Sequence, residues 1–133
     1  MIRIGLIGFG NMGKTHAFSV AAMPFYYSPL PFEAKIVGVV CSKHETTAAA
    51  AKAIGCKAYS SVKALISDPE IDLIDICTPN DSHEELIKLC VQYGKHIYCE
   101  KPLCPDAASS YRAADLIRDA GLVGKVVFHN RFF

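Results

Sequence analysis

The stretch "IRIGLIGFGNMG", residues 2–13, decides the fold of this chain. It begins as a short apolar run and ends with three glycines, Gly8, Gly10 and Gly13, in the spacing G-x-G-x-x-G. The spacing alone is a weak signal, but it gains meaning where it follows a strand and opens a helix, as the pattern predicts here. Gly8 then permits a tight turn, Gly10 leaves the backbone open to a pyrophosphate, and Gly13 lets helix and strand pack closely. The stretch predicts a dinucleotide-binding loop, with a plain strand–helix turn as the alternative.

The residues around the last glycine extend this predicted site. Asn11 and Met12 lie inside the loop, at the start of the expected helix. The first N–H groups of a helix have no intrahelical partner and lie at its positive end, so we expect this end to face the phosphates. Lys14 is either an additional charge near the phosphates or a solvated surface lysine.

Short apolar runs alternate with helical patterns along the rest of the chain. Strands are expected at residues 2–8, 35–42, 57–60, 71–79, 95–101 and 124–133. Helices are expected at Met12–Met23, Glu45–Ile54, Val62–Ile66, Ser82–Tyr93 and Asp106–Ala120. Several strands are apolar at consecutive positions, which is typical of a parallel sheet covered on both faces. The expected fold is therefore α/β: a doubly wound, mostly parallel, Rossmann-like sheet with helices on both faces.

Length and composition limit the classes of protein to which this chain can belong. The chain has 133 residues, 51% of them hydrophobic, and a net charge of +1, so we expect one domain over residues 1–133. The absence of a basic block argues against a nucleic-acid partner, and no apolar run is long enough to cross a membrane. The start lacks a signal peptide, so the six cysteines are expected to be reduced thiols of a cytoplasmic protein. Their spacing contains no C-x-x-C pair, and no metal site is predicted.

One link is long for its place in the pattern. The segment Pro24–Phe32, between the first helix and the second strand, is rich in proline and aromatic residues. The favoured interpretation is a loop that packs its aromatic side chains on the surface of the domain. The alternatives are a wall near the far end of the cofactor or a contact with another protein.

The end of the second strand bears on the choice of dinucleotide. An acid at this place would bind the ribose hydroxyls of NAD(H). The sequence has Ser42 and Lys43 there, and a hydroxyl with a cation suits the 2′-phosphate of NADP(H) better. Glu45 is close enough to be the ribose acid, or it is simply an acid in the first turn of a helix. NADP(H) is therefore favoured over NAD(H).

Polar residues also gather where the fourth and fifth strands end. Thr78, Asn80 and His83 follow the fourth strand, and Glu100 and Lys101 follow the fifth. The carboxyl ends of strands are where ligands bind in such sheets, so these residues are cofactor-site candidates. The alternative for His83 is a cap or surface residue. The alternative for Glu100 and Lys101 is a surface ion pair of negligible energy. The run from Asn80 to Ser82 offers N-cap oxygens to the next helix.

Four motifs in this order resemble the glucose–fructose oxidoreductase/inositol dehydrogenase (Gfo/Idh/MocA) family: "GFGNMG", "ICTPNDSH", "GKHIYCEKPL" and "VVFHNRFF". The resemblance implies oxidation or reduction of sugars, inositols or related polyols with a pyridine nucleotide. It implies that Thr78, Asn80 and His83 line the nicotinamide half of the cofactor. It also implies that Lys101 is catalytic and reaches the reacting carbinol and the nicotinamide ribose. Pro102 follows Lys101 and often forms a cis bond in this family.

The chemistry of hydride transfer explains why a lysine would stand there. Charge develops on the substrate oxygen, and Lys101 at a sheet end can polarise that oxygen and relay its proton. Glu100 beside it is expected to orient the lysine.

The family also has a second, α+β domain after the sixth strand. The resemblance implies that this domain holds much of the substrate pocket, further catalytic residues and the interface of a homo-oligomer. The chain ends where the crossing into that domain is expected, so it should bind cofactor yet be catalytically incomplete. A dinucleotide-binding sensor without catalysis is the main alternative, although Lys101 argues against it. A methyltransferase is a further alternative that leaves the strand-end motifs without a role.

Overall fold

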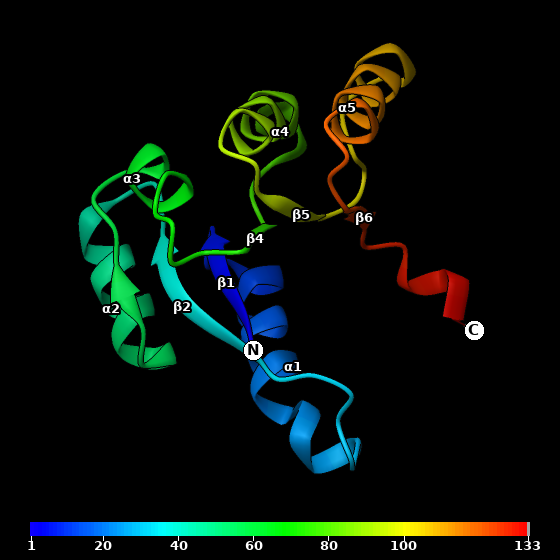
Figure 1. Cartoon of the computed structure of the whole chain (residues 1–133). Coiled ribbons are helices and arrows are strands. Elements are labelled where there is room, and N and C mark those ends of the chain that lie inside the picture. The colour runs from blue at the N-terminus through cyan, green and yellow to red at the C-terminus, as the bar shows by residue number, and fades with distance from the viewer. Residues whose placement is uncertain (133) are drawn as a thin grey trace.

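The computed structural model describes residues 1–132, with side chains described as far as Arg131, and shows one parallel sheet (Figure 1). The strands are β1 (Ile2–Ile7), β2 (Ala34–Val40), β3 (Lys57–Ala58), β4 (Leu73–Ile76), β5 (His96–Cys99) and β6 (Gly124–Val126). The α-helices are α1 (Asn11–Tyr26), α2 (His44–Ile54), α3 (Val62–Ile66), α4 (His83–Gln92) and α5 (Ala107–Asp119). Two 3₁₀ helices are η1 (Asn80–Ser82) and η2 (His129–Phe132). The predicted doubly wound α/β fold is confirmed.

The strand order β3-β2-β1-β4-β5-β6 contains one reversal of direction. From β1 the chain moves outward through β2 and β3, and then returns to place β4 on the other side of β1. Ile7, the last residue of β1, pairs with both Val40 and Ile76, so the carboxyl ends of these three strands are level. A crevice opens outside the strands at such a switch point, and ligands of open α/β sheets bind there.

The helices cover the sheet in two layers with separate cores. Side chains of α3, α4 and α5, such as Leu65, Ile87 and Ile117, share one hydrophobic cluster with β4 and β5. Ala50 and Ala51 of α2 lie in a second cluster with β1 and β2. Figure 1 shows α4 and α5 on one side of β4–β6 and α1 on the other. Each fully buried Leu or Ile contributes about 1.5–3 kcal/mol, so these two layers hold the strand ends in place.

Most elements differ from their predicted bounds, and the strands are mostly shorter than predicted: β4 was predicted over 71–79 but spans Leu73–Ile76. Helix α1 was predicted to end at Met23 but continues through Pro24 to Tyr26. Proline removes one N–H donor, which the last turn of a helix tolerates better than its middle. The final strand was predicted over 124–133 but stops at Val126, because β5, its partner among the described residues, ends at Cys99. Phe133, the last residue of that prediction, lies outside the described residues.

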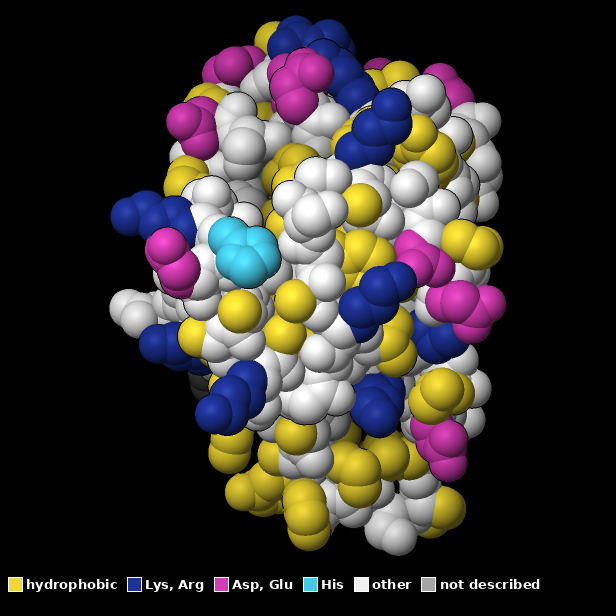
Figure 2. Space-filling model, turned by 90° about the vertical axis from the view of Figure 1, so that its left-hand side faces the viewer, with side chains coloured by type: hydrophobic (Ala, Val, Ile, Leu, Met, Phe, Trp, Pro, Cys, Tyr) yellow, Lys and Arg dark blue, Asp and Glu magenta, His cyan; other side chains and the backbone are white. Residues whose placement is uncertain are grey.

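The aromatic residues of Pro24–Phe32 do not pack as expected. Phe25 is 87% exposed and Tyr26 is 78% exposed, and Tyr27 and Phe32 are also exposed. Figure 2 shows hydrophobic side chains gathered at the lower end of the molecule, the end at which α1 finishes in Figure 1. The prediction that the aromatics of Pro24–Phe32 pack on the domain itself is therefore wrong for these residues. Within residues 1–132, no helix combines the length and apolar character that crossing a membrane requires.

Candidate functional site

The glycines of the loop have different structural reasons to be glycine. Gly8 has φ +92°, and a Cβ there would lie 2.6 Å from the carbonyl oxygen of Cys77. A Cβ on Gly13 would collide with the carbonyl oxygen of Gly8, which is backbone and cannot move aside cheaply. Gly10 differs, because a Cβ there would meet no atom within 4 Å. The turn and the packing therefore require Gly8 and Gly13, while Gly10 faces open space.

The N-terminus of α1 is free of a side-chain cap. Gly10 is the N-cap residue, no side chain accepts a hydrogen bond from the first turn, and that turn contains no acid. Asn11 and Met12 are exposed at this end. Because the first N–H groups of a helix need an outside acceptor and lie at its positive end, this end suits an anion such as a phosphate.

The second strand ends beside this loop. Val40 pairs with Ile7 and its carbonyl accepts a hydrogen bond from the N–H of Gly8 at 2.9 Å. Ser42 and Lys43 follow directly and are exposed. Lys43 is the N-cap residue of α2, but no side-chain cap bond forms. The structure therefore brings the predicted adenosine-end residues to the same edge of the sheet as the glycine loop.

The polar residues after β4 differ from one another in burial and in their hydrogen-bond partners. Thr78 and Asn80 are half-buried at the carboxyl end of β4, and the Thr78 hydroxyl lies 2.7 Å from that of Ser82. Ser82 was expected to cap α4, but its hydroxyl instead donates to the carbonyl of Pro79, and the N-cap expectation for this run is wrong. Asn80 and Ser82 belong to the 3₁₀ helix η1, which precedes α4.

His83 does not reach the surface of the site. Its side chain is fully buried, with Nε2 2.9 Å from the carbonyl oxygen of Thr78 and Nδ1 3.0 Å from that of Leu103. Both ring nitrogens are thus engaged with backbone, and the ring joins the loop after β4 to the loop after β5. This geometry does not support the expected direct contact of His83 with a ligand, because the ring is turned into the protein.

The turn after β5 also differs from the simple expectation. Lys101 is exposed, and the bond to Pro102 is cis. Glu100 was expected to orient the lysine side chain, but its Oε2 accepts a hydrogen bond from the Lys101 backbone N–H at 3.0 Å. The Glu100 side chain is only about a twentieth exposed, so the alternative of a surface ion pair is also wrong. Glu100 holds the backbone of the turn and leaves the Lys101 ammonium free to project outward.

The other oxygen of Glu100 belongs to a buried network that the sequence analysis did not identify. His16 of α1 places Nε2 3.1 Å from Glu100 Oε1 and Nδ1 2.9 Å from Asp75 Oδ2. His16, Asp75 and Glu100 are all buried. Burial opposes protonation of His16, but the hydrogen bonds and charges of Asp75 and Glu100 outweigh it and raise its pKa above the ordinary 6.5. Helix α1, which begins at the glycine loop, is thereby joined to β4 and to the turn that contains Lys101.

A signal for this network was present in the sequence. Asp75 stands between Ile74 and Ile76 in an apolar strand, and a carboxylate buried there needs a hydrogen-bonded partner. His16 lies three residues after Gly13, which places both on the face of the helix that meets the sheet. An acid inside a central strand, read together with a histidine on the facing side of the first helix, would have indicated the pair.

Cys77 completes the surroundings of His16. Its Sγ lies 3.3 Å from His16 Nδ1, and burial raises the pKa of this thiol well above its ordinary value, so it is a neutral thiol. His16, Asp75 and Cys77 bring potential ligand atoms within 4.8 Å of one another. Both ring nitrogens already face carboxylates, however, so we assign these residues to hydrogen bonding. All six cysteines are free.

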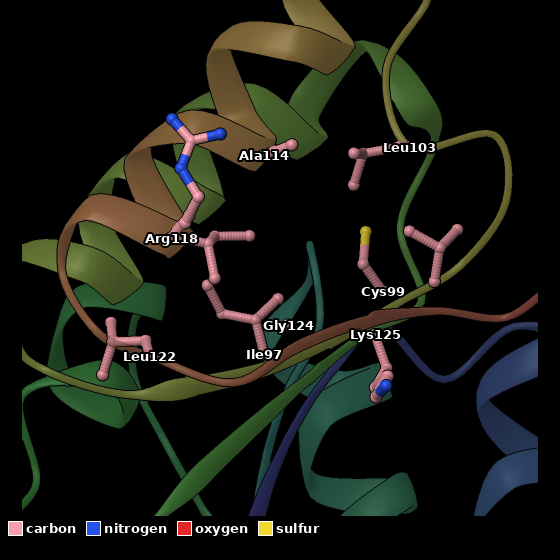
Figure 3. A pocket seen from close by; sticks show the side chains of 10 residues that line it. Ile97, Cys99, Leu103, Ala114, Arg118, Leu122, Gly124 and Lys125 are labelled. Carbon is pink, nitrogen blue, oxygen red and sulfur yellow. The ribbon is translucent and has the colours of Figure 1, made fainter.

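Two of the hollows beside the sheet lie near residues discussed above. One, of ≈ 630 Å³, lies beside α1 and has Met12, His16, Asp75 and Tyr98 among its lining residues. The other, of ≈ 290 Å³, lies between α5 and the β5–β6 edge. Figure 3 shows the Cys99 sulfur and Leu103 facing this second space, while Lys125 points away from it. Both hollows are lined mainly by apolar residues, and the first also has the buried His16 and Asp75 and the exposed Met12 of the loop in its wall.

Comparison with protein families agrees with this geometry. The family described as "Oxidoreductase family, NAD-binding Rossmann fold" matches residues 2–128. Levoglucosan dehydrogenase of Pseudarthrobacter phenanthrenivorans is 37% identical over 131 residues, which are 98% of this chain and 34% of that protein. Inositol 2-dehydrogenase of Rhizobium meliloti is 33% identical over 131 residues, 98% of this chain and 37% of that protein.

Solved structures give the same result. Levoglucosan dehydrogenase in complex with NADH and levoglucosan superposes with a TM-score of 0.92 at 37% identity, over 98% of this chain and 35% of that one. An NAD binding oxidoreductase from Klebsiella pneumoniae superposes with a TM-score of 0.92 at 33% identity, over 97% of this chain and 35% of that one. The chain therefore spans about a third of the length of the relatives it matches.

Proposed function

The chain belongs to the Gfo/Idh/MocA oxidoreductase family, and we propose that it is the cofactor-binding part of a dehydrogenase. The proposed reaction moves a hydride between nicotinamide and a sugar, an inositol or a related polyol. The relatives named for levoglucosan and for inositol support this substrate class. The observation that carries the proposal is the uncapped N-terminus of α1, opened by Gly10 at the switch point of the sheet.

We propose roles for the site residues according to their positions. Gly8, Gly10, Asn11, Met12 and Gly13 form the pyrophosphate cradle. Thr78 and Asn80 at the end of β4 line the nicotinamide half. His83 acts indirectly, without contact to the cofactor, as a positioning residue that fixes the carbonyl of Thr78 and the turn after β5.

Lys101 is the proposed catalytic residue. The bound dinucleotide supplies hydride transfer, and the protein must manage the charge and the proton at the substrate oxygen. Lys101 is exposed at the carboxyl end of β5 and would hydrogen-bond that oxygen, polarise it and relay the proton. Glu100 supports this role through the Lys101 backbone, because its own charge is directed to His16.

The remaining parts of the proposal concern the longer protein. We propose residues 1–133 as a dinucleotide-binding domain, with the substrate pocket and a homo-oligomer interface on a further domain. The length of the relatives supports this division. Free cysteines are in keeping with a reducing compartment, and a cytoplasmic location is proposed.

For the cofactor we propose binding of NADP(H) in preference to NAD(H). Support comes from Ser42 and Lys43, which are exposed beside the glycine loop where an acid would repel a 2′-phosphate. The named complexes of relatives contain NADH, so the choice must be decided by measurement on this chain.

We expect wild-type chain to bind NADPH more tightly than NADH in calorimetric titrations, and Ser42→Asp to reverse the preference. The added carboxylate lies near the 2′-phosphate position, and about 1.4 kcal/mol of repulsion corresponds to a tenfold loss of NADPH affinity. Ser42→Asn is the matched control, with the same size and no charge, and should change the ratio less than about threefold. Equal affinities in all three proteins would reject the assignment of the strand end, and failure to bind either nucleotide would reject the proposed function.

A further inference from the structure

His16 occupies a position that the proposed reaction does not use. It lies on α1, one turn beyond Gly13, and its ring reaches across the carboxyl end of the sheet. Asp75 meets it from β4, and Glu100 meets it from the end of β5. The contact therefore joins three segments that are separated by 59 and 84 residues in the chain from His16.

The geometry of the ring constrains its protonation. Nδ1 lies 3.0 Å and 2.9 Å from the two oxygens of Asp75, and Nε2 lies 3.1 Å from Glu100 Oε1. A neutral imidazole has one N–H and one lone pair, so one of the two carboxylates would face a lone pair. Donation to both carboxylates requires a ring that carries both protons. A positive ring also offsets the cost of burying two acids side by side.

The other groups that face His16 do not change this conclusion. From β4 these are Asp75 and Cys77, and from the β5 segment they are Tyr98 and Glu100. Burial raises the pKa of the Cys77 thiol and of the Tyr98 hydroxyl, so neither adds charge near neutral pH. Asp75 and Glu100 are therefore the two groups whose hydrogen bonds decide the state of the ring.

Glu100 links the His16 ring to the turn that contains Lys101. One oxygen of its carboxylate faces His16, and the other accepts the backbone N–H of Lys101 at 3.0 Å. A change at the ring thus reaches the Lys101 backbone through a single rigid carboxylate. At its other end, His16 is fixed to the helix whose N-terminus forms the phosphate cradle.

We propose that His16 is a positioning residue: held as an imidazolium between Asp75 and Glu100, it couples the phosphate-loop helix to the Lys101 turn. This inference rests on the proposed function for its purpose at the site, because Lys101 is placed there as the catalytic group. The coupling itself concerns contacts within the chain and can be measured without a nucleotide.

The test is an NMR titration of the 133-residue chain from pH 5 to pH 10, following the imidazole nitrogens and the Lys101 amide. We expect both nitrogens of His16 to be protonated at pH 7, and His96, exposed at the opposite end of β5, serves as the comparison ring. The Lys101 amide signal should shift with the same midpoint as His16. In His16→Gln this shift should vanish, and in the control His96→Gln it should remain.

The inference would be overturned if the His16 ring carried only one N–H at pH 7. It would also be overturned if the Lys101 amide signal did not shift at the pH at which His16 titrates. If His16→Gln does not fold, the wild-type titration still tests the coupling, because a common midpoint of His16 and the Lys101 amide can be measured without a variant. If wild type binds no nucleotide, the proposed function fails while the titration still decides the coupling.

Nucleotide binding adds a second readout. His16→Gln should raise the Kd for the preferred nucleotide about fivefold, and the same substitution in a Lys101→Ala background should change it less than about twofold. An undiminished effect in that background would mean that His16 supports the fold without acting through Lys101, which would overturn the proposed route.

Discussion

Replacement of Gly13 by alanine is expected to destabilise the chain by about 3 kcal/mol, which lowers Tm by about 10 °C for a domain of this size. The added methyl group would collide with the carbonyl oxygen of Gly8, so α1 must move away from the loop. The same movement displaces the helix N-terminus, and nucleotide affinity should fall below detection. Thermal unfolding followed by circular dichroism, with calorimetric titration of NADPH and NADH, measures both effects.

Gly10→Val is the matched control for this experiment, because it separates folding from binding. Gly10 has a negative φ of −74°, so it lies outside the left-handed region that favours glycine, and a Cβ there meets no atom within 4 Å. We expect Tm to stay within about 2 °C of wild type while nucleotide affinity falls at least tenfold, since the side chain fills the space left for the pyrophosphate. Unchanged affinity in Gly10→Val would contradict the phosphate role of the loop, and an unchanged Tm in Gly13→Ala would contradict the packing argument.

The second large effect is expected for Asp75→Ala, at about 3–5 kcal/mol of lost stability. Asp75 is 2% exposed and lies 2.9 Å from Nδ1 of His16, so its removal leaves that nitrogen buried without its carboxylate. Chemical denaturation monitored by circular dichroism gives the free energy of unfolding directly.

The control for Asp75→Ala is Asp115→Ala. Asp115 also pairs with a cation, Arg118, at 2.7 Å, but its side chain is half exposed. Exposed pairs of this kind contribute about 0.3–0.5 kcal/mol, so this variant should be nearly as stable as wild type. Similar losses for the two variants would show that burial of the His16–Asp75 pair has no special energetic weight.

The parts of the fold that follow local rules could be predicted from the sequence. The spacing of Gly8, Gly10 and Gly13 indicated the loop because it stands directly between a predicted strand and a predicted helix. Consecutive apolar positions indicated a parallel sheet, and right-handed crossovers then restricted its topology. The ends of strands and helices were less predictable, as α1 and β6 show, because neighbouring strands and the tolerance of a last turn decide them.

The sequence indicated which residues lie near the candidate site better than it indicated where their side chains point. Thr78, Asn80, Glu100 and Lys101 do lie at the carboxyl edge of the sheet. The direction in which His83 points, by contrast, depends on the backbone carbonyls of a loop about 20 residues further along the chain. The partnership of Asp75 with His16 joins segments 59 residues apart, so it could be inferred only by combining the acid inside β4 with the histidine on the facing side of α1.

The central place of β1 also has a consequence during synthesis on the ribosome. β1 leaves the ribosome first, yet one of its two neighbours, β4, begins only at Leu73. Until β4 has emerged, one edge of this apolar strand has no partner, and an unpaired apolar edge invites pairing between nascent chains. Pairing between strands so distant in sequence is also intrinsically slow. The nascent chain should therefore depend on chaperones until β4 has docked against β1.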